Sequence, residues 1–210
     1  EQKRRETLQN THGRVVGGPI RRLLASDEDF VPAIISVNDK NVDCKVRLKG
    51  DLEDHWSGRK WSLRVQVKKD GSVLGMSRFS LQDPATRHHT NEWLFLENLR
   101  MEDLFATRYR FVNLVLNGKP LGTYAMEEHF SKELIEGNRR REGIVINFDD
   151  HQFWNLHWNV SWQTIYRTAA INVRNSGRVA QSELLQQQKT AAVNLLRGLQ
   201  ERRLSGDDVF

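Results

Sequence analysis

Hydrophobic and polar residues alternate along the chain in a way that predicts two β-hairpins. The first is formed by Val31–Val37 and Val42–Leu48, which are rich in β-branched residues and are separated by the polar turn NDKN. The second begins at Phe111–Leu116, where both alternating sets are largely apolar, so we expect a strand that is covered on both faces. The Asn-Gly pair that follows tolerates positive φ and suits a two-residue turn, after which Leu121–Met126 returns antiparallel.

Further strands and a helix are predicted between these hairpins. From Trp61 to Val67, apolar residues alternate with polar ones, which is typical of a half-buried strand. A turn at Asp70-Gly71 then leads into a second strand, Val73–Leu81. Apolar residues recur at helical spacing over Asn91–Leu104, which predicts a helix packed on the sheet.

The last third of the chain is more helical in pattern. Residues 131–142 are expected to form a short helix or connector, and Gly143–Phe148 a strand. Three tryptophans at a spacing of four (Trp154, Trp158, Trp162) suggest a helical stripe, and Gln181–Arg203 has the pattern of an amphipathic helix. The sequence therefore predicts an α+β fold: a mainly antiparallel sheet with one packed helix, followed by helices.

Three segments follow from this order of elements. Residues 1–29 form a polar N-terminal arm, residues 30–130 the sheet and its helix, and residues 131–210 a connector followed by helices. A chain of 210 residues is long enough to bury a sizeable core in one large domain or two small ones.

Composition and charge exclude some classes of function. No run of 18 apolar residues is present, so we expect no membrane segment. The net charge of +5 comes from interspersed Lys and Arg without an aromatic-basic repeat, and we expect no nucleic-acid partner. A single cysteine, Cys44, allows no internal disulfide. A hydrolase is disfavoured because the chain has no G-x-S-x-G motif and its histidines lack metal-ligand spacing.

Candidate chemistry is carried by one face of the strand around Trp61. Lys60, Ser62 and Arg64 lie at positions i, i+2 and i+4 and therefore project from the same face. A Lys and an Arg that converge beside a polar loop are suited to hold phosphate groups. The alternative from the pattern alone is an exposed strand face whose charged groups are solvated.

Four segments together resemble the CotH-type atypical kinases, first known from bacterial spore coats. They are LNG-x-x-LG-x-Y-x-x-E-E-H within the second hairpin, RLKGDLEDHWSGRKWSLRV (Arg47–Val65), LGMSRFSLQDPATR (Leu74–Arg87) and RREGIVINFDD (Arg140–Asp150). They occur in the family's order and cover roughly residues 30–150. The resemblance implies an ATP-dependent phosphotransferase with a kinase-like small lobe at residues 30–130 and the start of a helical large lobe after it. It also points to a bacterial protein acting on coats or outside the cytoplasm.

The resemblance also suggests roles for individual residues. Lys60 would be the phosphate-anchoring lysine and Glu92 the helix acid that pairs with it, and these are the two catalytic candidates. The nucleotide-binding candidates are Arg64, Ser62, Gly50, His55 and Glu128. Gly50 and His55 belong to the loop that would cover the phosphates, and Glu128 to the hinge that would read the adenine edge.

Metal ligands are harder to find in the sequence. ATP and Mg²⁺ are the implied cofactors, but HRD and DFG motifs are both absent, and only Asp149 and Asp150 stand as weak metal candidates after the hinge. We therefore expect the chain to be an N-terminal portion that lacks the catalytic acids. The acceptor, a protein or surface component, is not identified by the sequence. The alternative function is a non-catalytic pseudokinase or a coat or surface scaffold.

Overall fold

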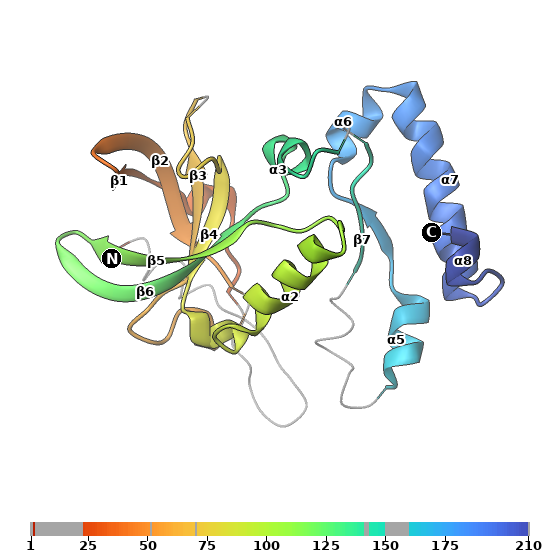
Figure 1. Cartoon of the computed structure of the whole chain (residues 1–210), viewed down its shortest axis with the longest axis horizontal. Coiled ribbons are helices and arrows are strands. Elements are labelled where there is room, and N and C mark those ends of the chain that lie inside the picture. The colour runs from red at the N-terminus through yellow and green to blue at the C-terminus, as the bar shows by residue number, and fades with distance from the viewer. Residues whose placement is uncertain are drawn as a thin grey trace. The chain divides into compact units, whose positions relative to one another are not determined.

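The computed structural model describes Gln2 and residues 23–50, 52–69, 71–140, 143–149 and 160–209. The chain divides into two compact units, Glu1–Arg141 and Glu142–Phe210. The first unit is built on a curled six-stranded antiparallel sheet, and the second on helices beside a two-stranded sheet (Figure 1). The predicted α+β class and mainly antiparallel sheet are confirmed.

The large sheet has the strand order β1-β2-β3-β4-β6-β5. Its strands are β1 (Val31–Val37), β2 (Lys40–Leu48), β3 (Leu63–Val67), β4 (Arg78–Gln82), β5 (Tyr109–Leu116) and β6 (Lys119–Glu128). The helical elements of this unit are the 3-10 helices η1 (Asp27–Asp29), η2 (Glu53–His55) and η3 (Pro84–Arg87), with α2 (Asn91–Met101) and α3 (Lys132–Gly137).

Strand alternation gives this sheet two different faces. One face packs the main core, which consists of Cys44, Val65, Val73, Met76, Phe79, Leu81, Tyr124 and Met126. On the other face, Leu96 of α2 packs with Ala106, Tyr109 and Ala125, and Trp93 and Leu99 lie against them. The predicted helix therefore covers part of the second face, and polar side chains such as Ser80, Gln82 and Glu127 lie beside it.

Turn chemistry explains the hairpin between β5 and β6. Asn117 and Gly118 have φ angles of 51° and 78°, and Leu116 pairs directly with Lys119. These are the positive φ values that a two-residue turn requires, so the predicted tight hairpin is confirmed.

Two predicted strands are shorter in the structure than in the sequence analysis. β3 begins at Leu63, so Lys60 and Trp61 precede it, and β4 begins at Arg78 and not at Val73. The residues before β4 form a loop closed by a bridge between Val73 and Met76. Both of these side chains are still buried, because the loop folds over and fills the core face of the sheet.

The second unit has a small core of its own. β7 (Ile146–Phe148) pairs with β8 (Ile171–Val173), and the helices are α5 (Trp162–Thr168), α6 (Ser176–Ala180), α7 (Glu183–Gln200) and α8 (Gly206–Val209). The buried Gln200 amide donates to the carbonyls of Tyr166 and Ala169, which ties α7 to the end of α5.

Some predictions fall on residues outside the described ranges. Of the polar arm at 1–29, only Gln2 and residues 23–29 are described, and of the three spaced tryptophans only Trp162, which begins α5. No described helix has the length and apolar character needed to cross a membrane.

Two glycines with positive φ provide a matched test of the fold. Gly50, just after β2, has φ 101°, and a Cβ added there would lie 2.2 Å from the His55 ring; Gly118 has φ 78° and open space around it. We expect Gly50→Ala to lower the free energy of unfolding by more than the roughly 1 kcal/mol expected at Gly118, because it adds a clash to backbone strain. Urea denaturation of both variants measures the difference, and equal losses would contradict this account of Gly50.

A polar cluster on the sheet as the candidate functional site

A row of side chains crosses four strands on the second face of the large sheet. Arg64 of β3 is paired with Ser80 of β4, Ser80 with Glu127 of β6, and Glu127 with Tyr109 of β5. Side chains that are directly opposite on neighbouring antiparallel strands share a face and lie close together. The sheet itself therefore gathers these four groups, one from each strand.

Lys49 joins this row from the end of β2. Its Nζ lies 3.2 Å from Glu127 Oε2 and 3.3 Å from Gln82 Oε1, and its side chain is only 15% exposed. Burial lowers the pKa of the Lys49 ammonium; the Glu127 carboxylate opposes this shift, and Arg64 and Arg87 add to it. Lys49 is thus a largely desolvated cation held by one acid and one amide.

The helical side of the site contributes a second ion pair. Arg87, at the end of η3, places Nε 3.2 Å from Oε2 of Glu92 in the first turn of α2. Burial raises the pKa of the Glu92 carboxyl, and the nearby Glu127 raises it further, while Arg87 and Lys49 lower it. Glu92 therefore faces both the strand lysine and the strand glutamate.

Two hydroxyl groups complete the arrangement. Ser80 is fully buried, and its Oγ has no hydrogen-bond partner among the described residues. Burial raises the pKa of Tyr109 to about 12, with Glu92 and Glu127 acting in the same direction. The polar cluster, as we call it, consists of Lys49, Arg64, Ser80, Gln82, Arg87, Glu92, Tyr109 and Glu127. Its three cations and two carboxylates leave one positive charge beside a buried hydroxyl, which suits an anionic ligand.

The predicted pair between Lys60 and Glu92 is not formed. Lys60 Nζ donates to the carbonyl of Thr123 at 2.9 Å and lies 3.7 Å from Asp83 Oδ1, whereas Glu92 pairs with Arg87. Lys60 precedes β3, and its ammonium reaches Thr123 of β6 instead of α2. The lysine whose charge lowers the pKa of Glu92 is Lys49, which directly follows β2.

Of the two adjacent hinge acids, Glu127 and not Glu128 belongs to the polar cluster. Glu128 projects to the core face, where its side chain is fully buried and accepts a bidentate interaction from Arg108 (Nε to Oε2, 2.6 Å). Arg108 also donates to the carbonyl of Gly75 at 2.7 Å. The structure therefore shows Glu128 in a contact that ties the loop before β4 to the hairpin strands.

Three other nucleotide-binding candidates contact one another. His55 is buried, its Nδ1 lies 2.8 Å from Ser62 Oγ, and Gly50 packs closely against the His55 ring. These contacts hold the loop between β2 and β3 in place. Of the five candidates, only Arg64 lies in the polar cluster.

The structure describes one of the two metal candidates. Asp149 accepts a hydrogen bond at 3.4 Å from Asn172 in the neighbouring strand, and Asp150 lies outside the described residues. Within the described part of the chain, no group of three or more His, Cys, Asp or Glu side chains is placed to hold a metal ion. We assign no metal ligand.

The sequence alone did not assign a role to Lys49 or Gln82, and it placed Glu127 beside Glu128 at the presumed hinge. Strand alternation together with strand pairing could have identified these residues. The backbone N–H of Lys49 donates to the carbonyl of Ser62 at 2.9 Å, and Gln82 is two residues beyond Ser80 and therefore on the same face. Comparison of the sequence with family models and with curated proteins gave no match. The functional interpretation consequently depends on this geometry and on the sequence motifs.

The Arg108–Glu128 contact should be required for stability. Replacing Arg108 with Met leaves a fully buried carboxylate without its cation, so we expect a loss of about 3–5 kcal/mol in the free energy of unfolding. Glu128→Gln should cost less, because the Arg108 side chain is 30% exposed and its guanidinium can turn to solvent. Chemical denaturation measures both, and a smaller loss for Arg108→Met than for Glu128→Gln would contradict this role.

The raised pKa of Glu92 predicts a pH dependence of stability. For an acid whose pKa is raised on folding, the stability contribution is complete below the unfolded pKa and is lost as pH rises through the folded value. We therefore expect Glu92→Gln to gain stability relative to the wild type as pH rises from about 4 to 7. Urea denaturation at stepped pH measures this, with Glu97→Gln as the control for removing one charge from α2. A constant difference between Glu92→Gln and wild type would refute the prediction.

Proposed function

We propose that the chain carries the nucleotide-binding part of an ATP-dependent phosphotransferase of the CotH-like kind, and that the polar cluster is where the phosphates bind. The observation that carries this proposal is Lys49, a largely buried lysine that lies beside Arg64 and faces Glu92 of α2. In protein kinases a strand lysine contacts the nucleotide phosphates and pairs with a glutamate of the adjacent helix. Here the lysine directly follows a strand and forms its ion pair with Glu127, and the glutamate lies in the first turn of the helix α2.

The energetics of the cluster favour an anionic ligand. Lys49 directly follows β2 and Arg64 lies in β3, and burial makes the charged form of Lys49 less stable than it is in water. A phosphate group close to these cations would offset that desolvation, and an Arg fork is suited to bind its oxygens in a bidentate manner. The buried Ser80 hydroxyl, which has no partner among the described residues, supplies a further hydrogen-bonding group.

The order of elements supports the same proposal. The helix α2 follows β4 and precedes the β5–β6 hairpin, and the hairpin ends at the segment that the sequence analysis assigned to the hinge. ATP would supply the phosphoryl group, and Mg²⁺ would neutralise its charge during transfer. Lys49, Arg64 and Arg87 would bind and orient the phosphates. The acceptor would be a protein or surface component.

Replacing Lys49 tests the proposal and separates it from the sequence-based choice of Lys60. Lys49→Met should weaken binding of ATP by at least about tenfold, equivalent to ~1.4 kcal/mol, because the charge is removed and the stem is kept. Lys60→Met, whose ammonium lies beside Asp83, should change the affinity by less than about twofold. Isothermal titration of the chain with ATP and Mg²⁺ gives these values.

Two controls make the result interpretable. Lys119→Met removes a charge from the exposed start of β6 and controls for the change in net charge. Lys49→Arg keeps the charge and should retain part of the affinity, and circular dichroism checks that each variant is folded. The proposal fails if the wild-type chain binds no ATP, or if Lys60→Met weakens binding and Lys49→Met does not.

A further inference from the structure

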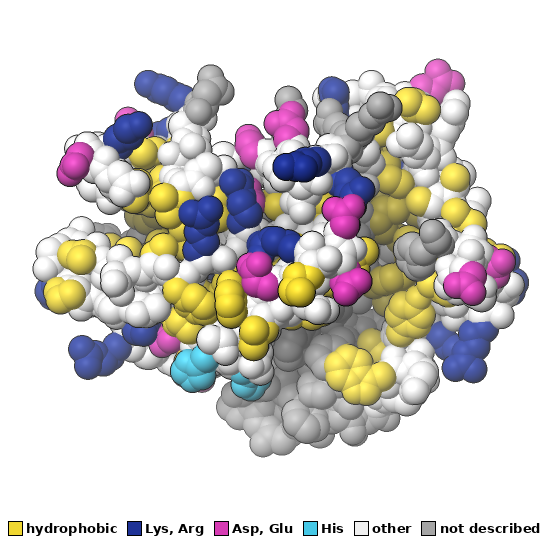
Figure 2. Space-filling model, in the orientation of Figure 1, with side chains coloured by type: hydrophobic (Ala, Val, Ile, Leu, Met, Phe, Trp, Pro, Cys, Tyr) yellow, Lys and Arg dark blue, Asp and Glu magenta, His cyan; other side chains and the backbone are white. Residues whose placement is uncertain are grey.

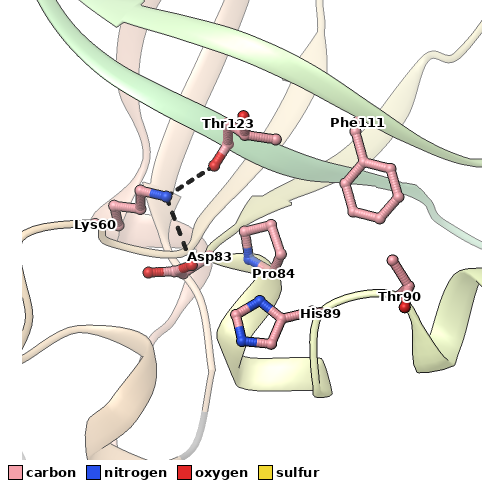
Figure 3. Close-up of a pocket in the computed structure, with 7 residues that line it drawn as sticks. All are labelled: Lys60, Asp83, Pro84, His89, Thr90, Phe111 and Thr123. Atoms are coloured by element: carbon pink, nitrogen blue, oxygen red, sulfur yellow. Dashed lines mark hydrogen bonds and ion pairs between the residues drawn. The ribbon is translucent and has the colours of Figure 1, made fainter.

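A hollow lies on the sheet face that carries the polar cluster, towards the tip of the β5–β6 hairpin. It has a volume of about 320 Å³ and is bounded by Phe111 and Thr123 of the hairpin and by the turn from Pro84 to Thr90. Figure 3 shows Phe111 above the turn, with Pro84 and His89 below, and Lys60 reaching in from the other end. This volume is within the range of small-ligand sites.

A second hollow adjoins the one below Phe111. The neighbouring hollow, of about 340 Å³, is also lined by Lys60 and Asp83, and its other walls come from Asp54, Arg59 and Leu121, with Pro120 and Gly58. The shared residues place Lys60 and Asp83 at the border of the two. We call the two adjoining hollows, with Lys60 and Asp83 between them, the groove; Phe111 lines one end and Asp54 and Arg59 line the other.

The wall below Phe111 is held in place by local hydrogen bonds. Asp83 Oδ1 accepts from the backbone N–H of Ala85 at 3.2 Å, and the Pro84 carbonyl accepts from the N–H of His89 at 2.8 Å. His88 and His89 have φ angles of 51° and 60°, which is unusual for residues other than glycine. Strained backbone of this kind persists where the surrounding structure fixes it, and it is often found at functional sites.

The border residues can both donate and accept hydrogen bonds. The Lys60 ammonium has three N–H donors; the Thr123 carbonyl takes one at 2.9 Å, and Asp83 lies 3.7 Å away, beyond hydrogen-bond distance. The Asp83 carboxylate has acceptor positions beyond the one used by Ala85. Lys60 and Asp83 are 29% and 30% exposed, so a ligand here would meet a donor and an acceptor that are both partly shielded from water.

We propose that this groove binds an extended polypeptide segment of a partner protein, with an aromatic side chain between Phe111 and the turn. Its peptide C=O and N–H groups would contact Lys60 and Asp83 respectively. A peptide group fits because it presents an acceptor beside a donor without a net charge. The charges of the lining also balance, with Lys60 and Arg59 against Asp83 and Asp54, which disfavours a highly charged ligand.

The probe for this proposal is N-acetyl-L-tryptophanamide, which carries one aromatic ring between two peptide groups. In ¹H–¹⁵N NMR titrations of the nucleotide-free 210-residue chain, it should shift the amide signals of residues 85–90, 111 and 123 in a saturable manner. N-acetylglycinamide, which has no ring, and indole, which has no peptide groups, should each bind at least about fivefold more weakly. Because no nucleotide is present, the outcome does not depend on the proposed phosphotransferase function.

Variants locate the binding. Phe111→Ala and Lys60→Met should each weaken binding of the probe by at least about fivefold. Ile34→Ala, a truncation of an exposed apolar side chain on β1, should leave the affinity unchanged within about twofold. The Phe111→Ala spectrum away from β5 shows whether the variant is folded, and Lys60→Met tests the site without removing the ring. Absence of saturable shifts, equal binding of indole, or wild-type affinity in both groove variants would each overturn the proposal.

Discussion

The first unit depends on one constraint, which is that the core face of its curled sheet must be dry. Val65, Phe79 and Met126 fill that face, so the residues between them in β3, β4 and β6 must project to the other side. Helix α2 covers only part of this second face. The members of the polar cluster that lie on strands are consequently placed by the same alternation that builds the core. Figure 1 shows how these strands run side by side in the sheet.

The polar cluster contains charged groups whose loss of hydration on burial is not fully offset by their ion pairs. Burial shifts the pKa of Lys49 downward and that of Glu92 upward, so each group is displaced towards its neutral form. Ion pairs of this kind contribute little net stability, since desolvation offsets much of the Coulomb attraction. Their position beside a buried Ser80 hydroxyl is therefore easier to explain by ligand binding than by folding. On α2, the hydrophobic side chains of Leu94 and Phe95 are exposed. Figure 2 shows that hydrophobic and charged side chains are mixed on this face of the molecule.

Local patterns in the sequence were sufficient for the elements of the first unit and insufficient for the site. The Asn117-Gly118 turn, the alternation of Leu63 and Val65, and the start of α2 at Asn91 follow from residue type and spacing alone. Alternation also predicts which residues of one strand share a face. It does not predict where the strand begins, and for that reason Lys60 was placed on β3.

The choice between Glu127 and Glu128 failed for a related reason. The two acids are chemically identical in the sequence, and only the pairing of β6 with β4 decides which one faces Lys49 and which one faces Arg108. Strand register is a long-range property, so a single sequence gives little information about it. Proximity of Lys49 to Glu92 likewise depends on how α2 crosses the sheet.

The two faces of the sheet are expected to respond differently to pH, because Arg108 contacts Glu128 on the core face while Lys49 and Glu92 lie on the other. A guanidinium stays protonated throughout the physiological range, and its hydrogen bonds to Glu128 raise its pKa further. The bond that joins the Gly75 loop to the hairpin is therefore retained when the surroundings become mildly alkaline. On the opposite face, Lys49 and Glu92 have pKa values displaced towards neutrality, so their charges are the ones that a change in surroundings or an arriving ligand can alter. On its core side the sheet thus carries Arg108, which stays charged. On the side where a ligand would bind it carries Lys49 and Glu92, whose charges respond more readily to their surroundings.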